Sequence, residues 1–168
     1  MSGNEILKKQ LEQTRFLRAL EYVQKDARGT KKLISSELLH LNQIINNATE
    51  STWRSQATKV KIPGGVEKQF SIINNPMVRA RDILTEAHAV LQRDENAQAA
   101  THLYTSLIKE HLFSDANRRT AVLAVVWLLL EKNIEINAQE LHDIPIGDIS
   151  DPANLKKIEA TISRLIGK

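Results

Sequence analysis

Apolar residues recur along most of the chain at spacings of three, four and seven positions, which is the pattern of amphipathic helices. Polar or turn-forming segments separate the periodic stretches, such as the run NNATEST that begins at Asn46. The pattern predicts helices over residues 4 to about 26, 31 to 46, 76 to 92, 96 to 110, 138 to 142 and 152 to 165. The chain is therefore expected to be mainly α-helical.

One segment, TKVKIPGGVEKQFSI, changes the period from helical spacing to alternation. Val60 and Ile62 alternate with Lys59 and Lys61, and the turn-forming residues 63–65, Pro-Gly-Gly, follow. This pattern predicts one β-hairpin. Because an isolated two-stranded hairpin is marginally stable, it must lean on the helices or close over something. The expected fold is a single domain, residues 1–168, built as a helical bundle with one hairpin.

The run from Ala121 to Leu130 contains only apolar residues, so it is hydrophobic on every side. Such a helix is buried on every side, and it should be the central helix of the bundle. Two cations, Arg118 and Arg119, stand at its amino terminus. They face the positive end of the helix dipole and unpaired backbone N–H groups, which favours a bound anion there. Phosphate suits this position best, because it accepts hydrogen bonds from both backbone N–H groups and guanidinium groups.

Composition excludes several classes of protein. There is no cysteine among the 168 residues, so disulfide frameworks and cysteine-ligated metal sites are ruled out. The first 20 residues are charged throughout, unlike a secretory signal peptide, and the longest apolar run is about half of the roughly 20 residues that span a bilayer. We therefore expect a cytoplasmic protein with no membrane segment.

The net charge of the chain does not indicate a particular class of partner. The 23 cations exceed the 20 anions by only three, which is too even a balance to argue for nucleic acid binding. A helix-turn-helix DNA-binding module is an alternative for a basic helical chain, but it requires an exposed polar recognition helix. The helix that follows the two arginines is apolar, which disfavours that alternative.

Four side chains with complementary chemistry lie within nine residues of each other around the start of the apolar helix. His111 supplies a base, Asp115 a ligand for a hard cation, Asn117 an amide and Arg119 a phosphate clamp. A purely structural interpretation is also open, since Asp115 and Glu110 can neutralise the arginines and Asn117 is an ordinary helix cap. The combination favours a phosphate-handling site.

The same residues carry a resemblance to a known family. The segment HLFSDANRRTA resembles the Fic/Doc signature HxFx(D/E)GNGRxxR, TWRSQATKVKIPGG is similar to the family's flap, and AATHLYTSLIKEH matches the helix that delivers the histidine. The resemblance covers roughly residues 30–135, which leaves flanking helices at both ends. It implies a Fic-type helical bundle with a hairpin flap and a transferase that modifies a Ser, Thr or Tyr hydroxyl of a target protein.

By position, the resemblance implies a role for each motif residue, with ATP or another nucleoside triphosphate as donor and Mg²⁺ as the metal ion. The implied roles are general base for His111, buried anchor for Phe113, metal ligand for Asp115, nucleotide and phosphate binding for Ala116, Asn117, Arg118 and Arg119, and target docking for Lys59, Val60, Lys61 and Ile62 of the flap.

The chain departs from the signature at three positions, since Ala116, Arg118 and Val122 stand where the pattern has Gly, Gly and Arg. These departures resemble Doc-type toxins, which transfer a terminal phosphate, and there Arg118 would stabilise the moving phosphoryl group. The resemblance therefore implies either a protein adenylyltransferase (an AMPylating nucleotidyltransferase) or a Doc-like protein kinase. A catalytically inactive Fic-fold scaffold is the alternative, because the departures could equally record a loss of activity.

Regulation is the last property that the resemblance addresses. Self-inhibited members carry an [S/T]xxxE[G/N] helix, and the only near match here is Ser106 with Glu110, which lies on the motif helix and is followed by His111. If the protein acts as a toxin, we expect its restraint to come from a separate antitoxin.

Overall fold

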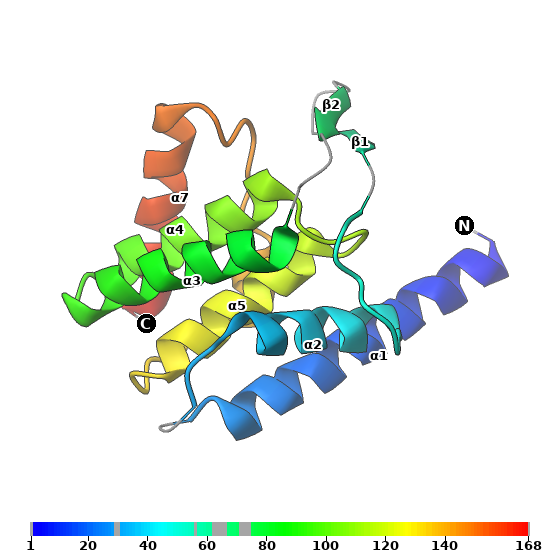
Figure 1. The fold of residues 1–168 in the computed structure, drawn as a ribbon, viewed down its shortest axis with the longest axis horizontal. Coiled ribbons are helices and arrows are strands. Elements are labelled where there is room, and N and C mark those ends of the chain that lie inside the picture. The colour runs from blue at the N-terminus through cyan, green and yellow to red at the C-terminus, as the bar shows by residue number, and fades with distance from the viewer. Residues whose placement is uncertain (1, 29–30, 56, 62–66, 71–74, 168) are drawn as a thin grey trace.

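The computed structural model describes residues 2–28, 31–55, 57–61, 67–70 and 75–167, and it is mainly helical (Figure 1). The elements are α1 (Gly3–Asp26), α2 (Ser35–Asn46), β1 (Thr58–Lys61), β2 (Glu67–Phe70), α3 (Pro76–Gln92), α4 (Asn96–Glu110), α5 (Asn117–Leu130), α6 (Ala138–His142) and α7 (Pro152–Ile166). The predicted fold class, a helical bundle with one hairpin, is confirmed.

Helix α5 lies at the centre of the bundle, with α4 packed along one side and α1, α2 and α6 around it (Figure 1). Every residue from Thr120 to Leu130 is buried. Helix α4 in turn packs against α3 and α7. The prediction that the apolar run forms the central helix is confirmed, and its amino terminus is therefore an internal position.

The second helix begins later than its periodicity predicts, at Ser35 instead of near residue 31. The residues just before it are not helical, and they make contacts with the central helix and with Glu131, which follows it. The backbone carbonyl of Lys31 accepts a hydrogen bond from the indole N–H of Trp127, at 3.0 Å, and the N–H of Leu33 donates to Glu131, at 3.1 Å. These two contacts replace the first helical turn.

Strands β1 and β2 pair antiparallel, with Thr58 opposite Phe70 and Lys61 opposite Glu67. The predicted turn at residues 63–65 and the predicted docking residue Ile62 lie outside the described residues. The hairpin stands at one end of the bundle, above the end of α4 (Figure 1).

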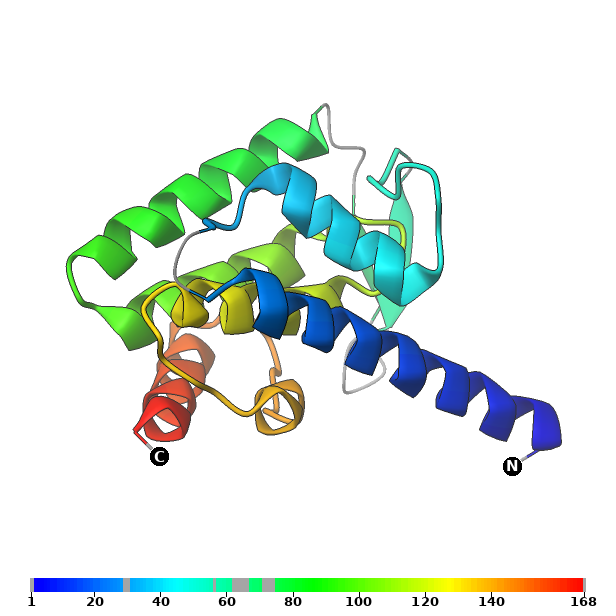
Figure 2. The same ribbon diagram turned by 90° about the horizontal axis from the view of Figure 1, so that it is seen from below.

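Helix α1 is only half covered by the rest of the molecule. Its later residues Phe16, Ala19 and Val23 are buried, whereas its first turns extend beyond the bundle (Figure 2), and Ile6 and Leu7 are about half exposed. Among the described residues, no helix combines the length and the apolar composition that crossing a membrane requires.

Candidate functional site

The loop between α4 and α5 has a left-handed residue at each end. His111 follows the last residue of α4 with φ 53°, and Ala116 precedes α5 with φ 59°. For a residue other than glycine this conformation costs about 1–2 kcal/mol. Since neither residue is glycine, the loop depends on surrounding contacts to hold its shape.

The segment before the hairpin supplies one set of these contacts. Backbone hydrogen bonds of 2.7 and 3.1 Å join residues 52–54 to residues 112–114 in an antiparallel bridge. The rings of Trp53 and Phe113 stack on each other at 4.6 Å, with 13° between their planes. Phe113 is buried, with 2% of its surface exposed, so it occupies the place that an anchor of the loop requires.

Two asparagines complete the support of the loop from inside. Asn117 closes a ring with Phe113: its Oδ1 accepts from the Phe113 N–H at 2.9 Å and its Nδ2 donates to the Phe113 carbonyl at 3.0 Å. Asn42 of α2 is fully buried and donates to the carbonyl of Asp115 and to the hydroxyl of Thr120. The side-chain amide of Asn117 is thus engaged within the loop, and an anion at this helix start would meet backbone N–H groups.

His111 lies between the loop and the hairpin. Its imidazole stacks on the ring of Phe70 at 4.4 Å, with 19° between the planes, and its carbonyl accepts from Arg54 Nε at 2.6 Å. Burial and the positive charge of Arg54 lower the pKa of His111, while Asp115 opposes this shift. The imidazole is therefore neutral at pH 7. No hydrogen bond to its ring nitrogens is found in the described part of the chain, so it is available to accept a proton.

Asp115 is the exposed carboxylate of the loop, and its Oδ1 accepts a hydrogen bond from the Ala116 N–H at 2.7 Å. Within the described ranges, no group of three or more His, Cys, Asp or Glu side chains is arranged to hold a metal ion. A single carboxylate with a free oxygen suits Mg²⁺, which keeps several waters and is completed by substrate phosphates. The chemistry of the site therefore fits Mg²⁺ bound together with a nucleotide.

Arg119 has no hydrogen-bond or ion-pair partner among the residues that the structure describes. Its half-buried side chain lines two cavities that meet beneath α1. The first, of about 330 Å³, also contains Asp115, and the second, of about 640 Å³, contains Phe16 and His142; Glu12 lines both. Cavities of this size hold small organic ligands. An unpaired cation between them is a candidate phosphate ligand.

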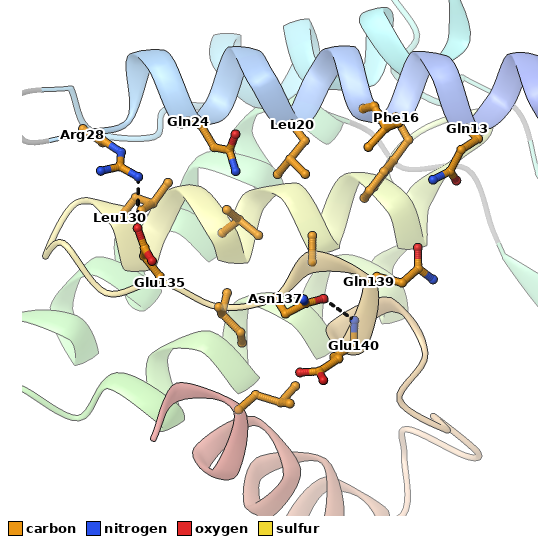
Figure 3. Close-up of a pocket in the computed structure, with 15 residues that line it drawn as sticks. Gln13, Phe16, Leu20, Gln24, Arg28, Leu130, Glu135, Asn137, Gln139 and Glu140 are labelled. Carbon is orange, nitrogen blue, oxygen red and sulfur yellow. Dashed lines mark hydrogen bonds and ion pairs between the residues drawn. The ribbon is translucent and has the colours of Figure 1, made fainter. Parts of the chain in front are cut away.

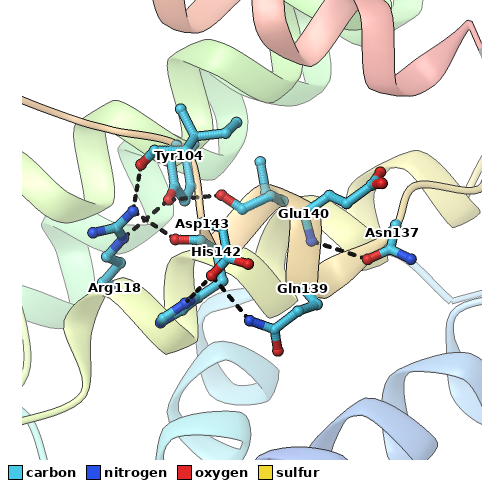
Figure 4. Close-up of polar contacts among 9 residues, drawn as sticks. Tyr104, Arg118, Asn137, Gln139, Glu140, His142 and Asp143 are labelled. Atoms are coloured by element: carbon cyan, nitrogen blue, oxygen red, sulfur yellow. Dashed lines mark hydrogen bonds and ion pairs between the residues drawn. The ribbon is translucent and has the colours of Figure 1, made fainter.

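The guanidinium of Arg118 makes hydrogen bonds within the protein. It donates to the hydroxyl of Tyr104 and to the backbone carbonyls of His142 and Ile144 (Figure 4). Consecutive helical residues point about 100° apart, so the two side chains leave α5 in different directions: Arg118 reaches backbone carbonyls at the end of α6, and Arg119 borders the cavities beneath α1. The resemblance implies that Arg118 binds phosphate, and in this geometry its Nε and Nη2 already donate to protein oxygens. These contacts tie α5 to α6.

A third cavity, of about 680 Å³, continues from the second along α1, and both are lined by Gln13, Phe16 and Gln139. Leu20 and Gln24 project into it from α1, and an ion pair of 3.1 Å between Arg28 and Glu135 closes its far end (Figure 3). The three cavities therefore adjoin one another beneath α1, and the first of them is lined by Asp115 and Arg119.

Sequence reasoning did not single out Arg54, Phe70 or Asn42 as site residues, although all three support the loop or His111. A signal existed for Arg54, because the Trp-Arg pair precedes an extended stretch. Phe70 and Asn42 are ordinary residues of a strand and a helix, and nothing in their local pattern indicates a contact with residues 40 or more positions away.

Comparisons with known proteins agree with the motif. The model of the Fic/DOC family matches residues 32–129. No curated protein matches the chain.

Several solved structures share the fold. A signaling protein from Bacteroides thetaiotaomicron that contains a Fic domain superposes with a TM-score of 0.68 at 20% identity, covering 96% of this chain and 68% of that one. A Fic family protein from Desulfovibrio desulfuricans gives 0.61 at 11% identity, covering 93% of this chain and 51% of that one. Fic-1 from C. elegans gives 0.50 at 16% identity, with 94% and 50% covered. At these identities the similarity shows the fold alone, and this chain spans about half the length of the last two.

Proposed function

Because this chain belongs to the Fic/DOC family, we propose that it transfers AMP or a terminal phosphate from ATP to a hydroxyl group of a target protein. Members of this family are typically transferases of this kind, although some are inactive. We further propose that it acts in the cytoplasm, as a toxin restrained by a separate antitoxin.

The observation that carries the proposal is the pair of unused polar side chains at the start of α5. Arg119 is unpaired within the described residues and borders two cavities, and His111 is neutral with no hydrogen bond to its ring in the same part of the chain. Buried or half-buried polar groups in proteins normally have partners. Groups without one, gathered beside an exposed carboxylate and a helix amino terminus, support a site for a phosphate-bearing substrate.

In the proposed reaction, His111 accepts the proton of the target hydroxyl as the hydroxyl oxygen forms a bond to phosphorus. Attack at the α-phosphorus breaks the bond to the β-phosphate and releases pyrophosphate, whereas attack at the γ-phosphorus releases ADP. Arg119 and the backbone N–H groups that follow Ala116 bind the phosphate oxygens and the charge that develops on them. Asp115 would hold Mg²⁺, which neutralises negative charge on the phosphate chain when bound.

The hairpin is proposed to dock the target. β1 and β2 form a two-stranded sheet, so an extended segment of the target can add its backbone as a further strand. Strand addition uses backbone groups, and it would bring a hydroxyl beside His111 without requiring a particular target sequence.

Labelled ATP tests the proposal. Wild-type protein and His111→Ala are incubated with cell lysate, Mg²⁺ and ATP labelled at either the α- or the γ-phosphate, with His102→Ala on the same helix as the matched control. We expect label to enter a lysate protein with wild type and with the control, and to be lost with His111→Ala. Label from the α position alone indicates AMP transfer, and label from the γ position alone indicates phosphate transfer. The intact mass of the modified target confirms which group moved.

Nucleotide binding separates the ways in which this proposal can fail. Binding of Mg-ATP by calorimetry without any labelled product would favour the inactive scaffold. If neither product nor binding is observed, the site does not handle nucleotides and the proposal is wrong.

A further inference from the structure

A buried arginine, Arg54, connects the hairpin to His111. It joins its own segment, which precedes the hairpin, to the end of α4 and to β2. Arg54 is 4% exposed, its Nε donates to the His111 carbonyl at 2.6 Å, and its Nη1 donates to the Phe70 carbonyl at 3.3 Å. Its guanidinium carbon also lies 5.8 Å from the centre of the Phe70 ring. Arg54 therefore links the end of α4 to the last residue of β2.

Phe70 completes this unit by stacking on the imidazole of His111 at 4.4 Å. One face of the imidazole is thus covered by an aromatic ring, which restricts rotation of the side chain and removes water from that face. The backbone carbonyl of Phe70 accepts a hydrogen bond from Arg54. The position of the imidazole is therefore set by the hairpin as well as by its own helix.

We propose that Arg54 and Phe70 are positioning residues for the base, so that the hairpin holds His111 in its reactive orientation in addition to docking the target. The inference rests on the proposed function for the role of His111, but the contacts themselves can be tested without catalysis.

The chemistry of an arginine explains why this residue type stands at position 54. A planar guanidinium presents several donors in a fixed fork, so one side chain can satisfy two carbonyls on different segments. Lysine retains the charge without this fork. The two effects of Arg54, hydrogen bonding and charge, can therefore be separated by substitution.

Among the described residues two charged groups act on the imidazole, and one of them, Arg54, belongs to these contacts. Arg54 disfavours the imidazolium from the hairpin side, and Asp115 favours it from the loop side. Phe70 adds the exclusion of water, which also disfavours the charged form. Because Phe70 belongs to β2, a strand added to the hairpin would change the environment of His111, and target docking would be coupled to activation of the base.

The first test follows the His111 ring by NMR through a pH titration of the full chain, in wild type, Phe70→Leu, Phe70→Tyr and Arg54→Lys. We expect Phe70→Leu to raise the midpoint of His111 toward that of a free histidine and to shift its ring resonances. Phe70→Tyr should retain the wild-type titration, because it keeps the stacked ring. Arg54→Lys should broaden the ring resonances by loosening the loop, with a smaller change in midpoint.

An unchanged His111 titration in both Phe70→Leu and Arg54→Lys would overturn the inference. If Arg54→Lys does not fold, Phe70→Leu decides alone, since Phe70 carries the ring contact. This test needs no activity, so it stands even if no labelled product forms and the proposed function fails.

The second test uses transfer to a lysate protein, once product has been observed with wild type. Phe70→Leu should lower kcat about tenfold to a hundredfold, the scale of a misplaced catalytic group, with the KM for ATP unchanged. The activity should return with Phe70→Tyr. A rise in the KM for ATP with unchanged kcat would contradict a positioning role.

Discussion

The two ends of helix α5 differ in how their polar groups are used. At the carboxyl end, Glu131 accepts hydrogen bonds from the Leu33 N–H and from His88 Nε2, at 3.1 and 3.0 Å, and Lys132 donates to the Leu91 carbonyl and to Asp94. At the amino end, Arg119 and the His111 ring lack such partners within the described residues. At the carboxyl end, which we call the closed end, the polar side chains are paired within the protein. At the amino end, the open end, polar side chains are left for a ligand.

The difference shows that charge alone does not identify a site. Both ends carry histidine, carboxylate and cationic side chains, but in the described part of the chain Arg119 at the amino end has no partner and borders two cavities. The helix dipole adds to the contrast, because an anion is stabilised at the amino end and repelled at the other. Substitutions at the two ends should accordingly affect different properties, activity at one and stability at the other.

The largest expected effect is the loss of the base at the open end. His111→Ala should lower the transfer rate about 10²- to 10⁴-fold, the usual contribution of a general base. The free energy of unfolding should fall by only about 1 kcal/mol, because the ring makes no hydrogen bond within the described residues and loses only its stacking on Phe70. The rate is measured with labelled ATP, and stability by urea unfolding. Activity retained within threefold would show that His111 is not the base.

The closed end gives the opposite result. Glu131→Ala leaves the Leu33 N–H and the Nε2 of His88 without an acceptor, and each buried unsatisfied group costs about 1–3 kcal/mol. We expect the free energy of unfolding to fall by about 2–4 kcal/mol in urea unfolding, with ATP binding per folded molecule unchanged. The control is Glu135→Ala, whose ion pair with Arg28 is exposed and contributes about 0–1 kcal/mol. Equal effects of the two substitutions would contradict the closed-end interpretation.

The adjacent arginines provide the sharpest comparison at the open end. Arg119→Met should weaken Mg-ATP binding about tenfold to a hundredfold, the value of a charged hydrogen bond, and leave stability nearly unchanged. Arg118→Met should instead lower the free energy of unfolding by about 1–3 kcal/mol, because it deprives the carbonyls of His142 and Ile144 of their donor. Calorimetry and urea unfolding measure the two properties. If Arg118→Met impaired binding as much as Arg119→Met at full stability, Arg118 would be a phosphate ligand after all.

The smallest effect concerns pH. The pKa of His111 is lowered in the folded protein by burial and by Arg54. Below the ordinary value of about 6.5 the unfolded chain therefore binds the proton more readily, and the free energy of unfolding falls as the pH is lowered toward the folded pKa. His111→Gln should reduce this loss of stability, which urea unfolding at a series of pH values measures. An identical pH dependence in both proteins would show that His111 does not contribute.

Most of the fold could be predicted from the sequence because helix periodicity is a local property. The bounds of α3, α4 and α6 follow from the spacing of their apolar residues and their flanking polar residues. The start of α2 could not be predicted in this way, since residues 31–33 lie outside the helix and contact Trp127 and Glu131 instead. A contact with a residue nearly 100 positions away leaves no trace in a local pattern.

In the candidate site, too, local features could be predicted from the sequence and contacts between distant residues could not. The sequence by itself determined that His111, Asp115 and Arg119 lie around the start of a buried helix, because they are neighbours in the chain and the apolar run fixes the helix. Only the tertiary structure decided that Arg118 contacts the carbonyls of His142 and Ile144 while Arg119 borders cavities, because that depends on where α6 and α1 lie. It also brought Arg54 and Phe70 to His111. Hydrogen-bond partners are chosen by position in space, which sequence order constrains only within a few residues.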